Sequence, residues 1–376
     1  MFYYLSQLIL DWCANTVWED RLSALRLFKY ITVRSAGAAL TALVISWWLG
    51  PRVIAWLKRV KFGQDYSDKA EVAGGMTARV LSKKGTPTMG GILIILALNL
   101  TTILWAQLNT LVLLSLLSVV VLTGLGFYDD YAKIIQQSGG GAKSKVKLLI
   151  QTILAVFIGL YLWLLPSTSK LVTEIMVPFY KHPVLTGAGL AGLVLTVLTI
   201  VGSSNAVNLT DGLDGLAVGC TLFVSFVFLI LTYLAGNFRS ASYLNIPYVE
   251  GAGELTVFCA AIIGAGLGFL WFNCHPAQVF MGDTGSLAIG GLIGVVAICC
   301  KQELLLAVVG GVFVIEATSV ILQVLSFKLT GKRIFAMSPI HHHFELSGWK
   351  ENTVIVRFWI LSAVFALLGL ATLKLR

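Results

Sequence analysis

Charge is scarce in this sequence. Only 12% of its 376 residues are charged and 57% are hydrophobic, whereas an ordinary soluble domain is about 25% charged. So little charge excludes a disordered chain and a nucleic-acid-binding module, and it argues strongly against a soluble two-domain enzyme. Because a bilayer-spanning helix needs roughly 20 apolar residues, the hydrophobic share suffices for about ten spans. The composition therefore predicts an all-α polytopic integral membrane protein.

Several signatures of other protein classes are also missing. The six cysteines form no CxxC pair or metal-ligand spacing, and most lie inside apolar runs, which is typical of small buried hydrophobes. No GxxxxGK[ST] motif supports ATP-driven transport, and no GxSxG motif supports acyl hydrolysis. The first 20 residues lack the basic start and continuous apolar core expected of a cleavable signal peptide.

Apolar runs bounded by charged or turn residues predict ten transmembrane helices. We expect a single domain over 1–376, in which 1–27 form a periplasmic or interfacial segment and 28–376 the ten-span core. The ninth span is long and contains Gly310 and Gly311, where the helix can break. The ten spans are predicted at 28–50, 88–107, 109–128, 147–166, 185–204, 216–236, 254–273, 286–300, 303–327 and 353–373.

Counting spans divides the connecting segments between the two sides of the membrane. One set, made of 51–87, 129–146, 205–215, 274–285 and 328–352, holds 15 Lys and Arg, while the other set, with both termini, holds 8. Cytoplasmic loops carry the excess of basic residues, so the first set is predicted to be cytoplasmic and both termini periplasmic. The net charge of +9 is therefore largely explained by topology.

Five aspartates lie at span ends on the predicted cytoplasmic side, in three separate connections. Ionisable groups at membrane depth are costly, which makes them candidates for a functional site. A helix cap or a solvated loop would explain any single one, but not all five on one face. The five are Asp129, Asp130, Asp211, Asp214 and Asp283.

The adjacent carboxylates of Asp129 and Asp130 require a cation nearby. Lys133 follows three residues later, and a hard divalent metal is the usual partner of clustered carboxylate oxygens. Asp283 offers a third acid in a glycine-rich segment, with the aromatic ring of Phe280 three residues before it. These residues predict a divalent-metal site.

A row of polar residues follows the fifth predicted span. Asn205, Asn208 and Asp211 fall three residues apart, and Asp214 continues the row. On a helix, this spacing places their amide and carboxylate oxygens on one face. The alternative is an Asn/Asp/Gly turn between two spans.

Histidine and lysine side chains complete the set of candidate site residues. His341, His342 and His343 share one internal loop, which suggests metal binding, although phosphate binding or acid/base work is at least as good an explanation. Lys83 and Lys84 precede a glycine-rich helix start that suits an anion, and the alternative is a snorkelling basic flank. Acids for Mg²⁺, basic groups for phosphates and close access to lipid favour phosphoryl transfer from a soluble anionic donor to a lipid phosphate.

Five segments carry these residues: GTPTMGG at 85–91, DDYAK at 129–133, NAVNLTDGLDG at 205–215, FMGDTGS at 280–286 and PIHHHFE at 339–345. Together they resemble the polyprenyl-phosphate N-acetylhexosamine-1-phosphate transferases, and the match runs in order from about Phe28 to the C-terminus. GTPTMGG and the three histidines are similar to the members that act on a muramoyl-pentapeptide donor.

The resemblance implies an activity. Phospho-MurNAc-pentapeptide would pass from UDP-MurNAc-pentapeptide to undecaprenyl phosphate, giving lipid I and UMP, the first membrane step of peptidoglycan synthesis in the bacterial cytoplasmic (inner) membrane. It also implies a Mg²⁺ cofactor with Asp283 as ligand, and Asp129, Asp130, Asp283 and Lys133 as catalytic residues. Phe280 would stack on uracil, and the histidines would hold the phosphates and sugar of the donor. The substrate-binding residues would be Lys83, Lys84, Thr88, Asn205, Asn208, Asp211, Asp214, Asn273, Phe280, His341, His342 and His343.

Two alternatives stay open at this point. A sister transferase would use UDP-GlcNAc, whereas a cation-coupled transporter would place acids inside its spans and show an internal repeat. Glu316 is the only acid well inside a predicted span, and no repeat is visible. Direct attack by the lipid phosphate is favoured over a covalent phospho-enzyme. Membrane lipids are expected partners, nucleic acid is not, and a homodimer is left open.

Overall fold

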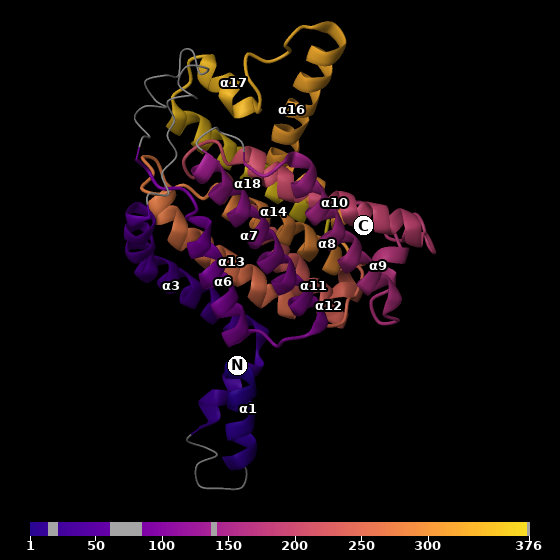
Figure 1. The fold of residues 1–376 in the computed structure, drawn as a ribbon. Coiled ribbons are helices and arrows are strands. Elements are labelled where there is room, and N and C mark those ends of the chain that lie inside the picture. Colours follow the sequence, from indigo (N-terminus) through magenta and orange to yellow (C-terminus); the bar gives the residue numbers. More distant parts are fainter. Residues whose placement is uncertain (14–21, 61–84, 137–140, 374–376) are drawn as a thin grey trace.

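The computed structural model describes residues 1–13, 22–60, 85–136 and 141–373 (Figure 1). Across these residues the fold is built from helices, and the only β pairing is an isolated bridge between Ile175 and Leu185. The all-α prediction is thus confirmed for the described part of the chain.

Nine of the described helices are long and apolar enough to cross a membrane, and α6 (Gly91–Trp105) is a shorter apolar helix. Each of these ten helices overlaps one predicted span. The nine are α3 (Ile31–Arg59), α7 (Thr110–Gln136), α8 (Ser144–Leu164), α10 (Gly189–Thr210), α11 (Leu216–Ala235), α13 (Glu254–Asn273), α14 (Gly282–Cys299), α16 (Gly311–Thr330) and α18 (Glu351–Ala371).

Several predicted spans differ from the observed helices at their ends. The third and fifth were predicted to end at residues 128 and 204, but α7 continues to Gln136 and α10 to Thr210. The first was expected to end at residue 50, but α3 continues to Arg59 with Pro51 inside it. Proline lacks a backbone N–H and costs the helix a hydrogen bond without always ending it. The ninth predicted span divides into α15 (Glu303–Val309) and α16, which meet at Gly310, so the break at the paired glycines is confirmed.

Helix α14 lies at the centre of the bundle (Figure 1). Every residue from Thr284 to Cys299 is buried, and α7 and α10 pack against the helix. A Cβ on Gly290 would lie 2.5 Å from the Ser203 carbonyl oxygen of α10. Small residues let neighbouring backbones approach closely in a membrane bundle. Asp283, in the first turn of α14, is therefore held by a helix that has little freedom to move.

A buried ion pair joins three parts of the bundle. The Arg34 guanidinium of α3 donates to both carboxylate oxygens of Glu254 on α13, at 2.6 and 2.7 Å. One of these oxygens also accepts the backbone N–H of Gln107, between α6 and α7, at 2.8 Å. Bidentate Arg–carboxylate pairing of this kind fixes the relative orientation of the two side chains as well as the distance between them.

Short helices extend from the two ends of the bundle. Helix α1 (Phe2–Cys13) and the 3-10 helix η1 (Ser23–Lys29) project at one end. Helix α17 (Ile340–Leu346), which contains the three histidines, lies at the opposite end (Figure 1). Two further short helices, α9 (Lys170–Thr173) and α12 (Phe238–Leu244), lie in the connections before α10 and α13.

Candidate active site

Three of the predicted acids converge. Asp129 and Asp130 lie in the last turns of α7, and Asp283 lies in the first turn of α14. One carboxylate oxygen from each residue lies within 4.8 Å of the others. Their side chains are 1%, 1% and 15% exposed. Clustered carboxylate oxygens are the ligands that a hard divalent cation prefers, so this donor set fits Mg²⁺.

Two lysines bridge the acids. The Lys133 ammonium contacts Asp129 Oδ2 at 2.6 Å and Asp283 Oδ2 at 3.0 Å. Lys147, on α8, contacts Asp129 Oδ1 at 3.3 Å and the same Asp283 oxygen at 3.1 Å. The sequence prediction missed Lys147 because a lysine at the start of a span is usually a topological signal. The four groups form one charge-compensated cluster.

Asp130 has a different environment from its neighbour Asp129. Its carboxylate accepts the backbone N–H groups of Asp283 at 3.3 Å and Thr284 at 3.0 Å, together with the Thr284 hydroxyl at 2.8 Å. The first N–H groups of a helix have no partner inside the helix, so Asp130 caps α14 from α7. Gly282 permits this approach: its φ is +72°, and a Cβ would lie 2.6 Å from Asp130 Oδ2.

Of the predicted polar row, Asn208 forms a hydrogen bond with one of the converging acids. The Asn208 amide donates to Asp283 Oδ1 at 2.8 Å and to Ser286 Oγ at 2.9 Å. Asn205 donates instead to Gln151 Oε1 of α8, at 2.8 Å. Asn208 therefore orients Asp283, whereas Asn205 holds α10 against α8.

The expectation that Asp211 and Asp214 continue a helical row is wrong. Helix α10 ends at Thr210, and Asp211 takes a C-cap conformation with φ −78° and ψ 49°. A turn follows and ends at Gly215, whose φ of 75° lies in the left-handed region that glycine adopts without strain. The Asn/Asp/Gly turn is thus the observed structure.

The turn separates the two aspartates. Burial, together with the negative charges of Asp283 and Asp130, raises the pKa of Asp211 to about 8, so this carboxyl group is largely protonated at neutral pH. Asp214 faces His275 and accepts the Ala277 N–H at 3.1 Å. Asp211 is thus electrostatically linked to Asp130 and Asp283.

Two of the sequence motifs form one structural unit. Backbone hydrogen bonds join the segment 87–91 to the segment 280–281: Phe280 N–H donates to Pro87 O, Gly90 N–H to Phe280 O and Gly91 N–H to Met281 O. Thr88, between them, is buried beside Gly282. Lys83 and Lys84 lie outside the described residues.

Asn273 has a structural role in this arrangement. Its amide donates to Val279 O at 2.8 Å, and its oxygen accepts the Gly215 N–H at 3.1 Å. The residue therefore ties the loop before Phe280 to the turn after α10. No polar contact of its side chain to Asp129, Asp130 or Asp283 is seen.

The three histidines have different hydrogen-bonding partners. His341 is fully buried, and its Nδ1 lies 3.0 Å from a carboxylate oxygen of the equally buried Glu316. His342 pairs with Glu345 at 2.9 Å, while His343 accepts the Ala336 N–H. Among the described residues, the sets of side chains that lie close enough together to hold a metal ion contain none of these three histidines. The geometry favours phosphate contact or positioning over metal ligation.

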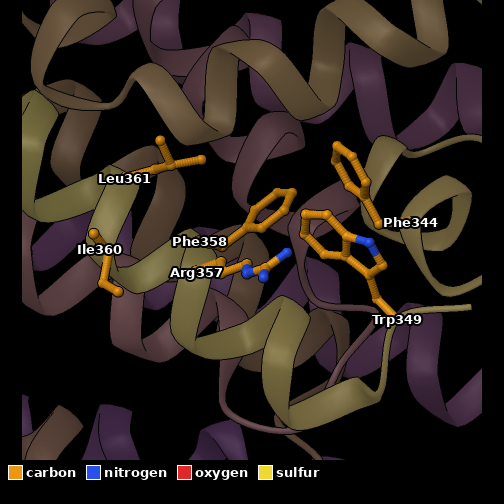
Figure 2. Close-up of a pocket in the computed structure, with 6 residues that line it drawn as sticks. All are labelled: Phe344, Trp349, Arg357, Phe358, Ile360 and Leu361. Carbon is orange, nitrogen blue, oxygen red and sulfur yellow. The ribbon is translucent and has the colours of Figure 1, made fainter.

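Aromatic side chains hold α17 against α18. Phe344 stacks on Trp349 with ring centroids 4.6 Å apart, and the Arg357 guanidinium lies 4.0 Å from the Trp349 ring centroid. These three residues, with Phe358, line a cavity of about 280 Å³ (Figure 2). These ring contacts anchor the histidine helix to the start of α18.

The fold and site together define a membrane-embedded transferase, with acids and lysines gathered where several spans end. Residues 111–301 match the model of glycosyl transferase family 4, and residues 83–95 match a phospho-N-acetylmuramoyl-pentapeptide-transferase signature. Two curated relatives carry the latter name. The protein from Methylacidiphilum infernorum is 54% identical over 356 residues, covering 94% of this chain and 97% of its own. The protein from Syntrophus aciditrophicus is 52% identical over 94% of this chain and 96% of its own.

The chain belongs to the phospho-N-acetylmuramoyl-pentapeptide-transferase family. This confirms the family resemblance seen in the sequence. It also sets aside the cation-coupled transporter, and it favours the muramoyl donor over UDP-GlcNAc.

Proposed function

We propose that the chain transfers phospho-MurNAc-pentapeptide from UDP-MurNAc-pentapeptide to undecaprenyl phosphate, giving lipid I and UMP. The observation that carries the proposal is the cluster of Asp129, Asp283, Lys133 and Lys147, with every ion-pair distance at or below 3.3 Å. Such a site matches a reaction between two phosphate-bearing substrates, because positioning and electrostatic stabilisation dominate phosphoryl transfer.

The membrane setting follows from the charge distribution. The 15-to-8 division of Lys and Arg supports a bacterial cytoplasmic membrane location with both termini periplasmic and the site at the cytoplasmic face. There the site meets a soluble nucleotide donor and a lipid acceptor. Residues 28–376 act as one transmembrane transferase domain.

The reaction is a displacement at phosphorus. An oxygen of the lipid phosphate attacks the sugar-linked phosphate of the donor, and the bond to UMP breaks, with UMP keeping its electron pair. The lipid phosphate is already anionic near neutral pH, so it needs little activation. Asp283 with Asp129 would hold Mg²⁺, which neutralises charge on the leaving group when bound. Lys133 and Lys147 contact both carboxylates, and we assign them to the phosphates of the two substrates.

The two adjacent aspartates take separate roles. The Asp130 carboxylate is occupied by the amides and hydroxyl at the start of α14, so we assign it as a positioning residue for Asp283. Asp129 accepts the Ala142 N–H at 2.8 Å and pairs with both lysines. Asp129 therefore holds the lysines, and would hold the Mg²⁺, that orient the lipid phosphate, and a covalent phospho-enzyme on Asp130 is disfavoured.

The exposure of each side chain decides which residues we assign to contact the nucleotide donor. Phe280, His342 and His343 are partly exposed, and we assign them to the uracil and to the phosphate and sugar region of the donor. His341 is closed off: a Cβ on Gly212 would lie 2.3 Å from its Nε2. We assign His341 to support the turn that carries Asp211.

Nucleotide analysis of one reaction tests the proposal. Purified full-length protein with undecaprenyl phosphate, UDP-MurNAc-pentapeptide and Mg²⁺ should release UMP, and omission of either substrate should stop the release. Asp283→Asn should remove most activity at a matched folded yield. UDP as the main product would refute displacement at phosphorus, and turnover of UDP-GlcNAc alone would assign the chain to the sister family.

A further inference from the structure

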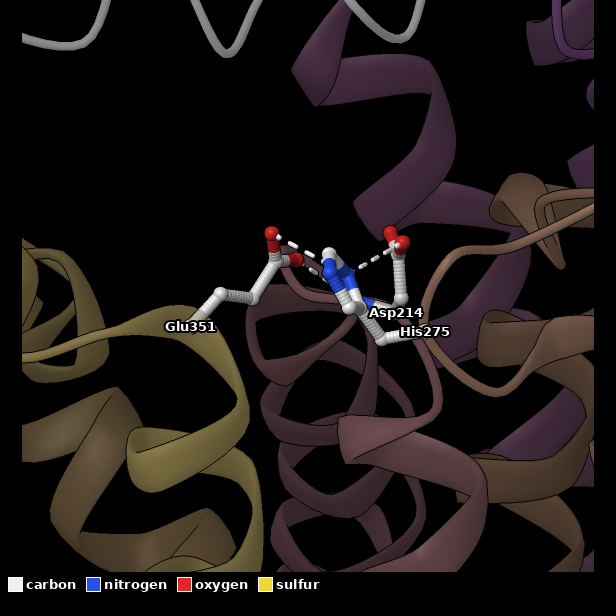
Figure 3. Close-up of side chains that lie close together, drawn as sticks. All are labelled: Asp214, His275 and Glu351. Carbon is white, nitrogen blue, oxygen red and sulfur yellow. Dashed lines mark hydrogen bonds and ion pairs between the residues drawn. The ribbon is translucent and has the colours of Figure 1, made fainter.

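Helix α18 carries an exposed arginine within its length. Arg357 is the seventh residue of α18 and its only basic one, about 9 Å along the axis from Glu351. The Glu351 carboxylate lies 3.4 Å from His275 Nδ1, beside the turn after α10 (Figure 3), so α18 begins at the end of the bundle where the candidate active site lies. Its 21 residues form a helix about 31 Å long, close to the thickness of the hydrocarbon core. Arg357 therefore lies below the headgroups when α18 spans a bilayer.

No carboxylate compensates the charge of Arg357 in the described part of the chain. The guanidinium instead stacks on the Trp349 ring, 4.0 Å from its centroid. This cation–π contact fixes the plane of the guanidinium but leaves its N–H groups free to donate to an acceptor. A charge at this depth is costly unless it is paired or reaches the headgroup region. The guanidinium is thus suited to an anionic group that belongs to the membrane.

An apolar cavity adjoins this charge. It has a volume of about 280 Å³, near the lower limit of about 300 Å³ for ligand pockets, which is room for part of a ligand. Arg357 contributes the only charged side chain of its lining (Figure 2). The other lining residues are Phe344, Trp349, Phe358, Ile360 and Leu361. One cation in an apolar lining fits an amphiphile with an anionic head and a hydrocarbon body.

The surface of α18 extends the apolar lining along the helix. Leu361, Val364 and Leu368 follow Arg357 by four, seven and eleven residues, and all three are exposed. Residues at these spacings lie on one face of a helix. Eleven residues cover about 16 Å, which is roughly half of the hydrocarbon core. This face therefore offers a cation at its outer end and aliphatic side chains through the depth of one leaflet.

We propose that Arg357, together with the cavity beside it, binds an anionic phospholipid of the leaflet on the active-site side of the membrane. The phosphate would accept hydrogen bonds from the guanidinium, whose planar fork matches phosphate oxygens. One acyl chain would lie along Leu361, Val364 and Leu368. Basic pockets beside membrane-spanning helices bind lipid headgroups in this way.

A membrane phospholipid fits this site better than the acceptor lipid of the proposed reaction. Undecaprenyl phosphate also combines a phosphate with a hydrocarbon chain, but its phosphate has to meet Lys133 and Lys147, which lie on α7 and α8. Helix α18 packs against α11, α15, α16 and α17. A lipid held by Arg357 is therefore a resident ligand that joins α17 to α18, and its binding does not depend on the proposed transfer reaction.

Lipid retention is the direct test. Full-length protein in detergent is incubated with dioleoyl phosphatidylglycerol or dioleoyl phosphatidylcholine, without either substrate, and the lipid retained per chain is counted by native mass spectrometry. We expect one phosphatidylglycerol to be retained in preference to phosphatidylcholine. Arg357→Gln should weaken its binding by about 5-fold or more. Arg52→Gln is the matched control, because Arg52 is also exposed and lies 4.2 Å from the Trp48 ring centroid but does not line the cavity.

Thermal unfolding provides a second readout that also reports folding of the variants without lipid. A lipid that binds only the folded state raises the melting temperature, so phosphatidylglycerol should raise that of the wild type and of Arg52→Gln more than that of Arg357→Gln. Equal retention by wild type and Arg357→Gln would overturn the proposal. Equal losses in Arg357→Gln and Arg52→Gln would show a general attraction of basic residues and overturn it too. Displacement of phosphatidylglycerol by equimolar undecaprenyl phosphate would assign the site to the acceptor instead.

Discussion

Replacing Lys147 by methionine tests whether two lysines, not one, compensate the charges of Asp129 and Asp283. The ammonium group lies 3.1 Å from Asp283 and 3.3 Å from Asp129, and its side chain is 21% exposed. A fully solvated ion pair contributes at most about 1 kcal/mol. Here the two carboxylates are 15% and 1% exposed, so screening by water is reduced. Loss of a preorganised charge at a reacting phosphate costs about 3 kcal/mol, and we expect kcat/KM to fall roughly 100-fold.

The assay is UMP release at varied Mg²⁺. Lys147 occupies the same carboxylate oxygens that a cation needs, so Lys147→Met should reach its half-maximal rate at a lower Mg²⁺ concentration while its maximal rate falls. A purely structural role would not produce this split. Lys145→Met, two residues away and exposed, should behave as wild type. Wild-type turnover by Lys147→Met, with Lys133→Met inactive, would refute the reasoning.

Three further outcomes are expected. Arg34→Met removes the ion-pair partner of the buried Glu254 carboxylate. The free energy of unfolding should fall by about 3–5 kcal/mol and the melting temperature should fall with it; an unchanged melting temperature would contradict this. Asp211 has a pKa of about 8 in the fold, against an ordinary value of 3.8. The unfolded chain therefore releases this proton first, and the free energy of unfolding should fall as pH rises between these values. Asp211→Asn should remove that part of the decline in pH-dependent unfolding, and an unaltered profile would argue against it. A Cβ on Gly126 would lie 2.2 Å from the Asp283 carbonyl oxygen, whereas nothing lies within 4 Å of one on Gly124; Gly126→Ala should therefore lose most UMP release and Gly124→Ala should keep it.

The helical class, the spans and the meeting of three acids could all be predicted from the sequence. Hydrophobic runs of span length predict where the helices lie. Because Asp129, Asp130 and Asp283 follow or precede spans on the same side of the membrane, the short connections restrict them to one region. The prediction failed where backbone conformation decided the outcome. Spacing of three residues is compatible with a helix, but the glycines after Asp211 and Asp214 favour a turn.

Contacts between segments that are far apart in the chain could not be predicted from the sequence. Lys147 looks like any basic residue at the edge of a span until α8 is placed beside α7 and α14. Glu316 was visible as an unusual acid within a span, yet its partner His341 lies 25 residues further along the chain. Two fully buried groups of this kind are paired only by the packing of α17 against α16.

The cap that Asp130 provides for α14 has a mechanical consequence. It clamps the first turn of a fully buried helix to the last turns of α7, so the gap between Asp129 and Asp283 is set by a few hydrogen bonds inside the protein. The outer helices, such as α3 and α18, meet the lipid and must adapt to its thickness and lateral pressure. Neither α3 nor α18 contributes a side chain to the cluster of Asp129, Asp283, Lys133 and Lys147. The distance between Asp129 and Asp283 should therefore depend on these hydrogen bonds more than on the thickness of the bilayer around α3 and α18.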